Sequence, residues 1–223
     1  MHRGPHPEDP QLFHAQGAAD FATALEDYSW LLSRGYSRPA GLTLVGDRFQ
    51  LTQRQRVALG RCACSQEAQQ ERRRKQVHHF ESLHIDGLNA LTTVEAALAG
   101  GVVLRGKDGC YRDMASFHGN YRMVEEAPRA AQLIGIHLQG RPAHWLLDRP
   151  VSNTGRLAAL LRDLAAERNW PWTVELVADP DPLLKTSSEV VATSDSAILD
   201  GCTRWYNLAR AVVEGLPEVW LFP

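Results

Sequence analysis

The chain has few of the features that would assign it to a membrane or to the secreted proteins. No apolar stretch approaches the roughly 20 residues that span a bilayer, and residues 1–15 contain no apolar segment typical of a secretory signal. The four cysteines are too few and too scattered for a disulfide framework. A net charge of -2 provides no overall attraction to nucleic acid. We therefore expect a cytoplasmic protein without a membrane partner.

The composition is that of an ordinary soluble protein, with 44% hydrophobic and 22% charged residues among 223. Residues 1–15 are rich in proline and histidine and are expected to be disordered. The following hydrophobic patterns change period near residue 79. We expect a basic, mainly α-helical domain over residues 16–78 and an α/β domain over residues 79–223.

The expected helical domain contains three helices. Apolar residues spaced by three and four positions predict the first, over residues 18–35, and Pro39 and Gly41 predict a loop after it. Thr52 is typical of a helix N-cap and predicts a second helix from residue 53. A polar stretch over residues 65–75 predicts the third.

The expected α/β domain alternates strands and helices, which is typical of a mostly parallel sheet covered on both faces. We expect strands over residues 80–85, 102–104, 144–147, 173–177 and 189–193, and helices over residues 90–99, 124–138, 153–167 and 197–214.

Aspartates follow three of the strand-like runs, at Asp86, Asp148 and Asp195. Ligands of open α/β sheets bind at the carboxyl ends of the strands, so these side chains are expected to meet there. Mg²⁺ and Mn²⁺ prefer such oxygen ligands and promote phosphodiester hydrolysis. Asp200 in the first turn of the last helix and Asp113 in the central loop are further candidates. As an alternative, Asp148 starts a turn and Asp195 caps a helix.

Polar residues beside these acids are candidate supporting groups. Asn89 can fix the turn after Asp86, and Ser152 and Asn153 stand at a helix N-terminus, where backbone N–H groups favour phosphate. An ordinary turn or cap is the alternative for each. An aspartyl phosphatase is disfavoured because position 88 is leucine, where that chemistry requires a second aspartate.

A local excess of positive charge lies between Asp47 and Lys75, with eight basic residues against three acidic ones. Arginine binds phosphate bidentately, so this segment is a candidate nucleic-acid surface. A solvated charged helix face is the alternative. The candidate residues are Arg48, Arg54, Arg56, Arg61, Arg72, Arg73, Arg74 and Lys75.

The motifs at the acids resemble those of the PIN/NYN-type ribonuclease superfamily. The segment Ile85-Asp86-Gly87-Leu88-Asn89 is similar to the Asp-Gly-x-Asn signature of NYN domains, and Ala192-Thr193-Ser194-Asp195 is similar to the later Thr-x-Asp of PIN domains. The resemblance implies a Rossmann-like, three-layer fold and metal-dependent cleavage of RNA. It makes Asp86 and Asp195 metal ligands, with Asn89, Thr193 and Ser194 in support. Asp113 and Asp148 compete for the middle acid, and Asp200 is an alternative for the last.

Over residues 20–215 the chain also resembles a prokaryotic family that carries the domain of unknown function numbered 434 before a PIN-like half. The segments Gly35–Ser37 and Leu44–Phe49 carry this resemblance, which implies no activity. Together, these patterns predict a metal-dependent ribonuclease. It would use Mg²⁺ or Mn²⁺, take RNA as its partner and have Asp86, Asp148 and Asp195 as catalytic residues. A non-catalytic RNA- or protein-binding protein on the same fold is the alternative. A homodimer is left open.

Overall fold

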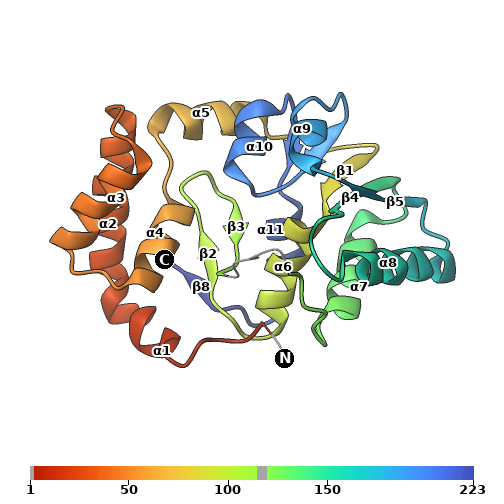
Figure 1. The fold of residues 1–223 in the computed structure, drawn as a ribbon, viewed down its shortest axis with the longest axis horizontal. Helices are drawn as coiled ribbons and strands as arrows, with labels where there is room; N and C mark the ends of the chain where they lie inside the picture. The colour runs from red at the N-terminus through yellow and green to blue at the C-terminus, as the bar shows by residue number, and fades with distance from the viewer. Residues whose placement is uncertain (1–2, 115–119) are drawn as a thin grey trace.

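A computed structural model describes residues 3–114 and 120–223 as an α/β structure with a helical N-terminal region (Figure 1). The helical region occupies one side of the molecule, and the larger, parallel sheet and its helices occupy the other. Within the described residues, no helix is both long and apolar enough to cross a bilayer.

Five helices form the N-terminal region between residue 3 and residue 78. The second, fourth and fifth match the three expected helices, and Thr52 caps α4 through a reciprocal capping box with Gln55. Residues 9–12, for which we expected disorder, form a helical turn, and the buried Asp9 accepts hydrogen bonds from Arg54. The helices are α1 Asp9–Leu12, α2 Ala15–Ser33, α3 Arg38–Arg48, α4 Gln53–Cys62 and α5 Gln66–Lys75.

Helix α3 replaces the loop that Pro39 and Gly41 had indicated. Ser37 caps this helix by accepting a hydrogen bond from the N–H of Ala40, and proline is tolerated in the first turn because its missing N–H has no helical partner there. A Cβ at Gly41 would lie 3.0 Å from the ring of Tyr28. The glycine therefore permits close packing of α3 against α2.

The larger sheet has five parallel strands in the order β5-β4-β1-β6-β7. From the central β1 the chain first builds β4 and β5 on one side and then β6 and β7 on the other. This reversal places a topological switch point at the carboxyl end of β1, where ligands of open sheets bind. The strands are β1 Leu83–Asp86, β4 Ala143–Asp148, β5 Trp172–Val177, β6 Val190–Ala192 and β7 Trp205–Tyr206.

Helices cover both faces of this sheet and form two apolar cores. The core on one face contains side chains of α6 Gly87–Leu98, α7 Ala127–Leu138, α8 Thr154–Arg168 and α11 Leu208–Val213. The smaller core on the other face contains side chains of α9 Pro180–Lys185 and α10 Ser196–Gly201. Helix α5 crosses from the helical region and contacts α10 (Figure 1).

Two expectations within the α/β part were wrong. The helix expected over residues 197–214 is interrupted by β7, because the Trp205 indole N–H donates to the Arg72 carbonyl at 2.7 Å and its strand pairs with β6. The strand expected over residues 102–104 is present as β2, Val103–Arg105, but it belongs to a separate sheet and not to the parallel one. That sheet has the order β3-β2-β8, with β3 Tyr111–Arg112 and β8 Leu221–Phe222.

The helical region does not complete its own core. Val102, Leu104 and Phe222 pack among buried side chains of α2 and α4, including Phe21 and Leu59. The second sheet therefore joins the two parts of the chain, and it brings α4 and α5 near the carboxyl edge of the larger sheet.

Candidate functional site

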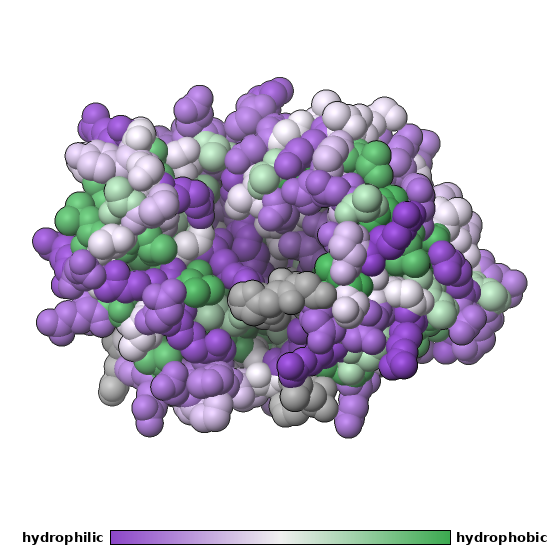
Figure 2. Space-filling view, in the orientation of Figure 1, coloured by the Kyte–Doolittle hydropathy of each residue, from purple (hydrophilic) through white to green (hydrophobic). Residues whose placement is uncertain are grey.

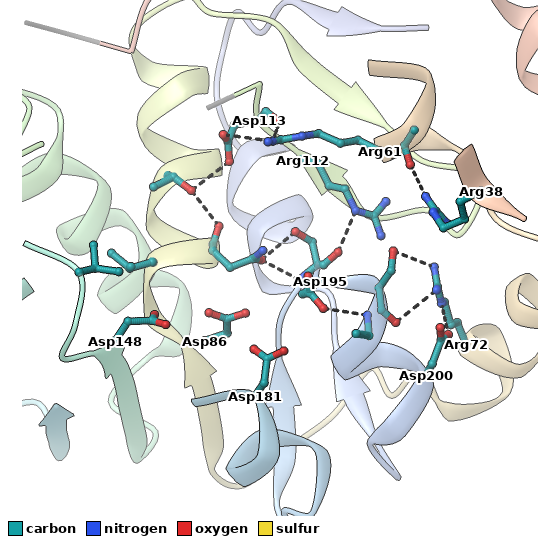
Figure 3. Close-up of a pocket in the computed structure, with 18 residues that line it drawn as sticks. Arg38, Arg61, Arg72, Asp86, Arg112, Asp113, Asp148, Asp181, Asp195 and Asp200 are labelled. Atoms are coloured by element: carbon teal, nitrogen blue, oxygen red, sulfur yellow. Dashed lines mark hydrogen bonds and ion pairs between the residues drawn. The ribbon is translucent and has the colours of Figure 1, made fainter. Parts of the chain in front are cut away.

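The three strand-end aspartates line one cavity of about 750 Å³. Asp86 ends β1, Asp148 ends β4, and Asp195 follows β6 by three residues. Figure 3 shows these side chains with those of Asp113, Asp200 and Asp181 around the cavity. In Figure 2 the middle of this face is a hollow surrounded by hydrophilic residues. The structure thus brings all five aspartates singled out in the sequence to one cavity.

Asp86 is the electrostatic centre of the site. Its side chain is buried, and this burial, together with the charges of Asp195, Asp148 and Asp181, raises its pKa to about 7. A hydrogen bond from Thr193 Oγ1 to Asp86 Oδ2, 2.8 Å long, opposes the increase. Asp86 therefore exchanges its proton near neutral pH, which is the range in which acid–base groups of enzymes work.

The loop after β6 is held against β1 by side-chain hydrogen bonds. Asn89 Oδ1 accepts from Ser194 N at 2.8 Å and from Ser194 Oγ at 2.7 Å. Thr193 Oγ1 accepts from Asp195 N at 3.0 Å while it donates to Asp86. These bonds couple the first and last acids through the three residues expected to support them.

Asp195 also acts as a helix cap, which was the alternative interpretation of its position. Its Oδ1 accepts hydrogen bonds from Ala197 N at 2.7 Å and Ile198 N at 3.1 Å. The cap fixes the carboxylate at the N-terminus of α10, and the side chain still lines the cavity. Structural and functional interpretations of Asp195 are therefore compatible.

The two candidates for the middle acid lie in different surroundings. Asp148 stands beside Asp86 in Figure 3, and its charge contributes to the raised pKa of Asp86. Burial raises the pKa of Asp148 itself. Asp113 accepts hydrogen bonds from Thr92 and Thr93 and forms an ion pair with Arg61 at 3.7 Å. Asp148 is thus the better partner for Asp86.

Asp181 on α9 is a site residue that the sequence did not reveal. Its charge raises the pKa of both Asp86 and Asp148, and it forms an ion pair with Lys185 at 3.3 Å. The Asp-Pro-Asp-Pro run of residues 179–182 is a helix-start pattern that could have indicated a carboxylate near a strand end.

Two of the expected supporting residues hold another segment instead. Asn153 Nδ2 donates to the Tyr121 carbonyl at 2.8 Å and to Asn120 Oδ1 at 3.1 Å. Ser152 forms a β-bridge with Asn120. Neither residue lines the cavity. They secure the chain at residues 120–121, because the Ser152 carbonyl also accepts a hydrogen bond from Tyr121 N at 3.1 Å.

Arginines form the opposite wall of the cavity. Figure 3 places Arg38, Arg61, Arg72 and Arg112 away from Asp86 and Asp148. Arg72 is 2% exposed and bonds to Asp108 at 2.6 Å and Asp200 at 2.8 Å. The Arg112 guanidinium donates to the Ser194 carbonyl at 2.8 Å and to both oxygens of Asp108. The buried cluster Arg72–Asp108–Arg112 therefore connects α5 to the loop that carries Asp195.

Most of the expected nucleic-acid-binding residues form internal contacts. Lys75 is buried and donates to the carbonyls of Leu199 and Asp200. Lys75 cannot contact phosphate without losing these bonds, whereas Arg73 is exposed and the paired side chains of Arg48 and Arg74 are also largely exposed. The ion pairs are Arg48–Asp27, Arg54–Asp9, Arg56–Asp47, Arg61–Asp113, Arg72–Asp108, Arg72–Asp200 and Arg74–Glu71.

The carboxylates suit a hard divalent cation by their chemistry. Burial and then the charges of Asp195, Asp148 and Asp181 raise the pKa of Asp86, so a positive charge among these carboxylates would relieve the repulsion. Among residues 3–114 and 120–223, no three His, Cys, Asp or Glu side chains form a ready-made metal cluster. Mg²⁺ commonly uses one or two carboxylates together with water and substrate oxygens, so the residues fit it.

Comparison with known proteins places the chain in a family. Residues 20–75 match a family described as a protein of unknown function, DUF434, and residues 76–211 match the domain of unknown function DUF5616. An uncharacterized protein of Methanocaldococcus jannaschii is 31% identical over 182 residues, which cover 79% of this chain and 87% of the relative. No solved structure matches the chain. The chain thus belongs to the family that carries a DUF434 segment followed by a DUF5616 domain.

Proposed function

We propose that the protein is a metal-dependent ribonuclease with a PIN-type α/β domain. The observation that carries the proposal is the convergence of Asp86, Asp148 and Asp195 in one cavity at the topological switch point of the sheet. These acids come from three parts of the chain that are far apart in sequence. A common structural need, such as capping one helix, does not account for their meeting.

Each part of the cavity has a role in this proposal. Asp86 and Asp148, with Asp195 and Asp181 nearby, would hold Mg²⁺ or Mn²⁺. A bound cation supplies Lewis-acid stabilisation of the charge on the scissile phosphate. Asp86, with its pKa near 7, must lose its proton to act as a ligand. Arg38 is exposed on the opposite wall and would orient the phosphate.

The test compares wild-type protein with Asp86→Asn on end-labelled single-stranded and structured RNAs in Mn²⁺ or Mg²⁺. We expect cleavage by the wild type, loss of cleavage with chelator, and a rate at least 100-fold lower in the variant. Asp163→Asn removes an exposed carboxylate of α8 and is the matched control. Equal cleavage by wild type and Asp86→Asn would overturn the proposal.

A non-catalytic RNA- or protein-binding protein on the same fold is the second candidate. It is favoured by the finding that no metal cluster is preformed among the described residues. It predicts RNA binding that depends on salt but not on divalent cation, and no cleavage of any RNA in the panel. Binding that is abolished by chelator would count against it.

A further inference from the structure

The helical region contains a second hollow, next to the arginine wall of the cavity. It has a volume of about 490 Å³ and lies between the end of α2, the start of α5 and the turn at Lys107. Its polar lining includes an ion pair between Lys107 and Glu26. Ser29 also lines it, and the buried Oγ of this residue has no hydrogen-bond partner among the described residues.

Two chain segments connect this hollow to the carboxylate cavity. Residues 33–38 line the hollow at Ser33 and Arg34 and line the cavity at Arg38. Residues 60–66 do the same, from Gln66 in the hollow to Gly60 in the cavity. The two segments are hydrogen-bonded to each other at both ends: Gln66 N donates to Ser33 Oγ, and the Arg38 guanidinium donates to the Gly60 carbonyl. The two depressions therefore share their walls.

Exposed aromatic and basic side chains gather at the end of α2 and on the segment that follows it. Trp30 is 57% exposed and Tyr36 is 53% exposed, and no other aromatic residue stands among the exposed large hydrophobic residues of the described chain. Arg34 stacks over the Trp30 ring at 5.1 Å. Within the described residues, neither Arg34 nor Arg38 forms an ion pair with an acidic side chain, in contrast to most arginines of the helical region.

We propose that this surface, formed by Trp30, Arg34, Tyr36 and Arg38, binds single-stranded RNA and leads it to the carboxylate cavity. Unpaired bases stack on aromatic rings, and arginines without acidic partners attract the phosphates between them. A duplex hides its bases from such rings. The inference that the RNA is led to the carboxylate cavity rests on the proposed nuclease function, but the binding itself requires no catalysis.

Binding is measured by fluorescence anisotropy of a labelled single-stranded oligouridine, with full-length protein in EDTA so that no cleavage occurs. We expect Trp30→Ala and Arg38→Gln each to raise the Kd roughly tenfold. Arg38→Gln should also reduce the slope of log K against log salt by about 0.7, the value for one phosphate contact of a single strand. Arg129→Gln is the matched control, because Arg129 is exposed on α7 and bonds only to Gln132 among the described residues.

Three further arms identify the ligand. Duplex RNA of the same length should bind at least tenfold more weakly, and single-stranded DNA of the same sequence shows whether the 2′-hydroxyl contributes. Equal binding of duplex and single strand, or unchanged Kd in both Trp30→Ala and Arg38→Gln, would overturn the inference. If single-stranded RNA does not bind but Asp86-dependent cleavage persists, the inference about this surface is rejected and the nuclease proposal stands. If single-stranded RNA binds as expected but no RNA is cleaved, only the nuclease proposal is rejected.

Discussion

At the residue scale, Asp86 shows how folding prepares a site at a cost in stability. In an unfolded chain its pKa would be near 3.8, and burial beside three other aspartates raises the pKa to about 7. Between these two values the folded state binds the proton more tightly than the unfolded state. The free energy of unfolding therefore falls as pH rises from about 4 to 7, and the loss is complete above pH 7.

Asp86→Asn should consequently stabilise the protein at pH 8 while it abolishes cleavage. We expect an increase of about 2–4 kcal/mol in the free energy of unfolding at pH 8 in EDTA, shrinking toward zero near pH 4. Urea denaturation of wild type, Asp86→Asn and Asp163→Asn across this pH range measures it. A variant less stable than wild type at pH 8 would contradict the raised pKa.

The individual residues also show what could be learned from sequence. The positions of Asp86, Asp148 and Asp195 after apolar runs were sufficient to predict that they meet, because the carboxyl ends of parallel strands share an edge. The acidic partners of the arginines were not predictable from the sequence. Arg54 meets Asp9 only because the chain folds back over 45 residues, so an exposed basic surface could not be distinguished from internal ion pairs.

At the scale of elements, local signals predicted the helices better than the short strands. Thr52 caps α4 as expected, and Ser65 caps α5 where the third helix was expected to begin, because a cap depends on residues within one turn. Strand β7 has only two residues, and it is fixed by pairing with β6 and by the bond from Trp205 to Arg72. Such long-range contacts override the helical pattern of residues 197–214.

The junction of β1 and α6 leaves no room for a side chain at Gly87. A Cβ there would lie 2.5 Å from Leu147 Cδ2 and 3.0 Å from the Leu146 carbonyl oxygen. Gly87→Ala should push α6 away from β4, destabilise the protein by about 1–3 kcal/mol and reduce cleavage. Gly155→Ala is the matched control, since a Cβ at this helical position has nothing within 4 Å. Equal melting temperatures for the two variants would contradict the close approach.

At the scale of the whole molecule, the helical and α/β parts are joined more closely than the sequence suggested. The boundary expected at residue 78 lies near the point where the two family matches meet, at residues 75 and 76. Phe222, however, packs in the helical core, with its ring centroid 4.9 Å from that of Phe21. A contact across 200 residues leaves no local pattern, so the shared core could not be foreseen.

The buried cluster Arg72–Asp108–Arg112 adds a polar connection between the two parts, and it predicts that they unfold together. Arg72→Met leaves Asp108 with one guanidinium and Asp200 with none, and breaking a buried pair typically costs about 3–5 kcal/mol. We expect one calorimetric transition in the wild type and a lower melting temperature in Arg72→Met. The control Arg73→Met changes a neighbouring, exposed residue and should leave the melting temperature within about 1 °C of the wild-type value.

Because Arg112 holds the Ser194 carbonyl from the same cluster, Arg72→Met should also weaken cleavage at temperatures where it remains folded. Two separate transitions in the wild type would show that α2–α5 fold independently and that the cluster does not couple them.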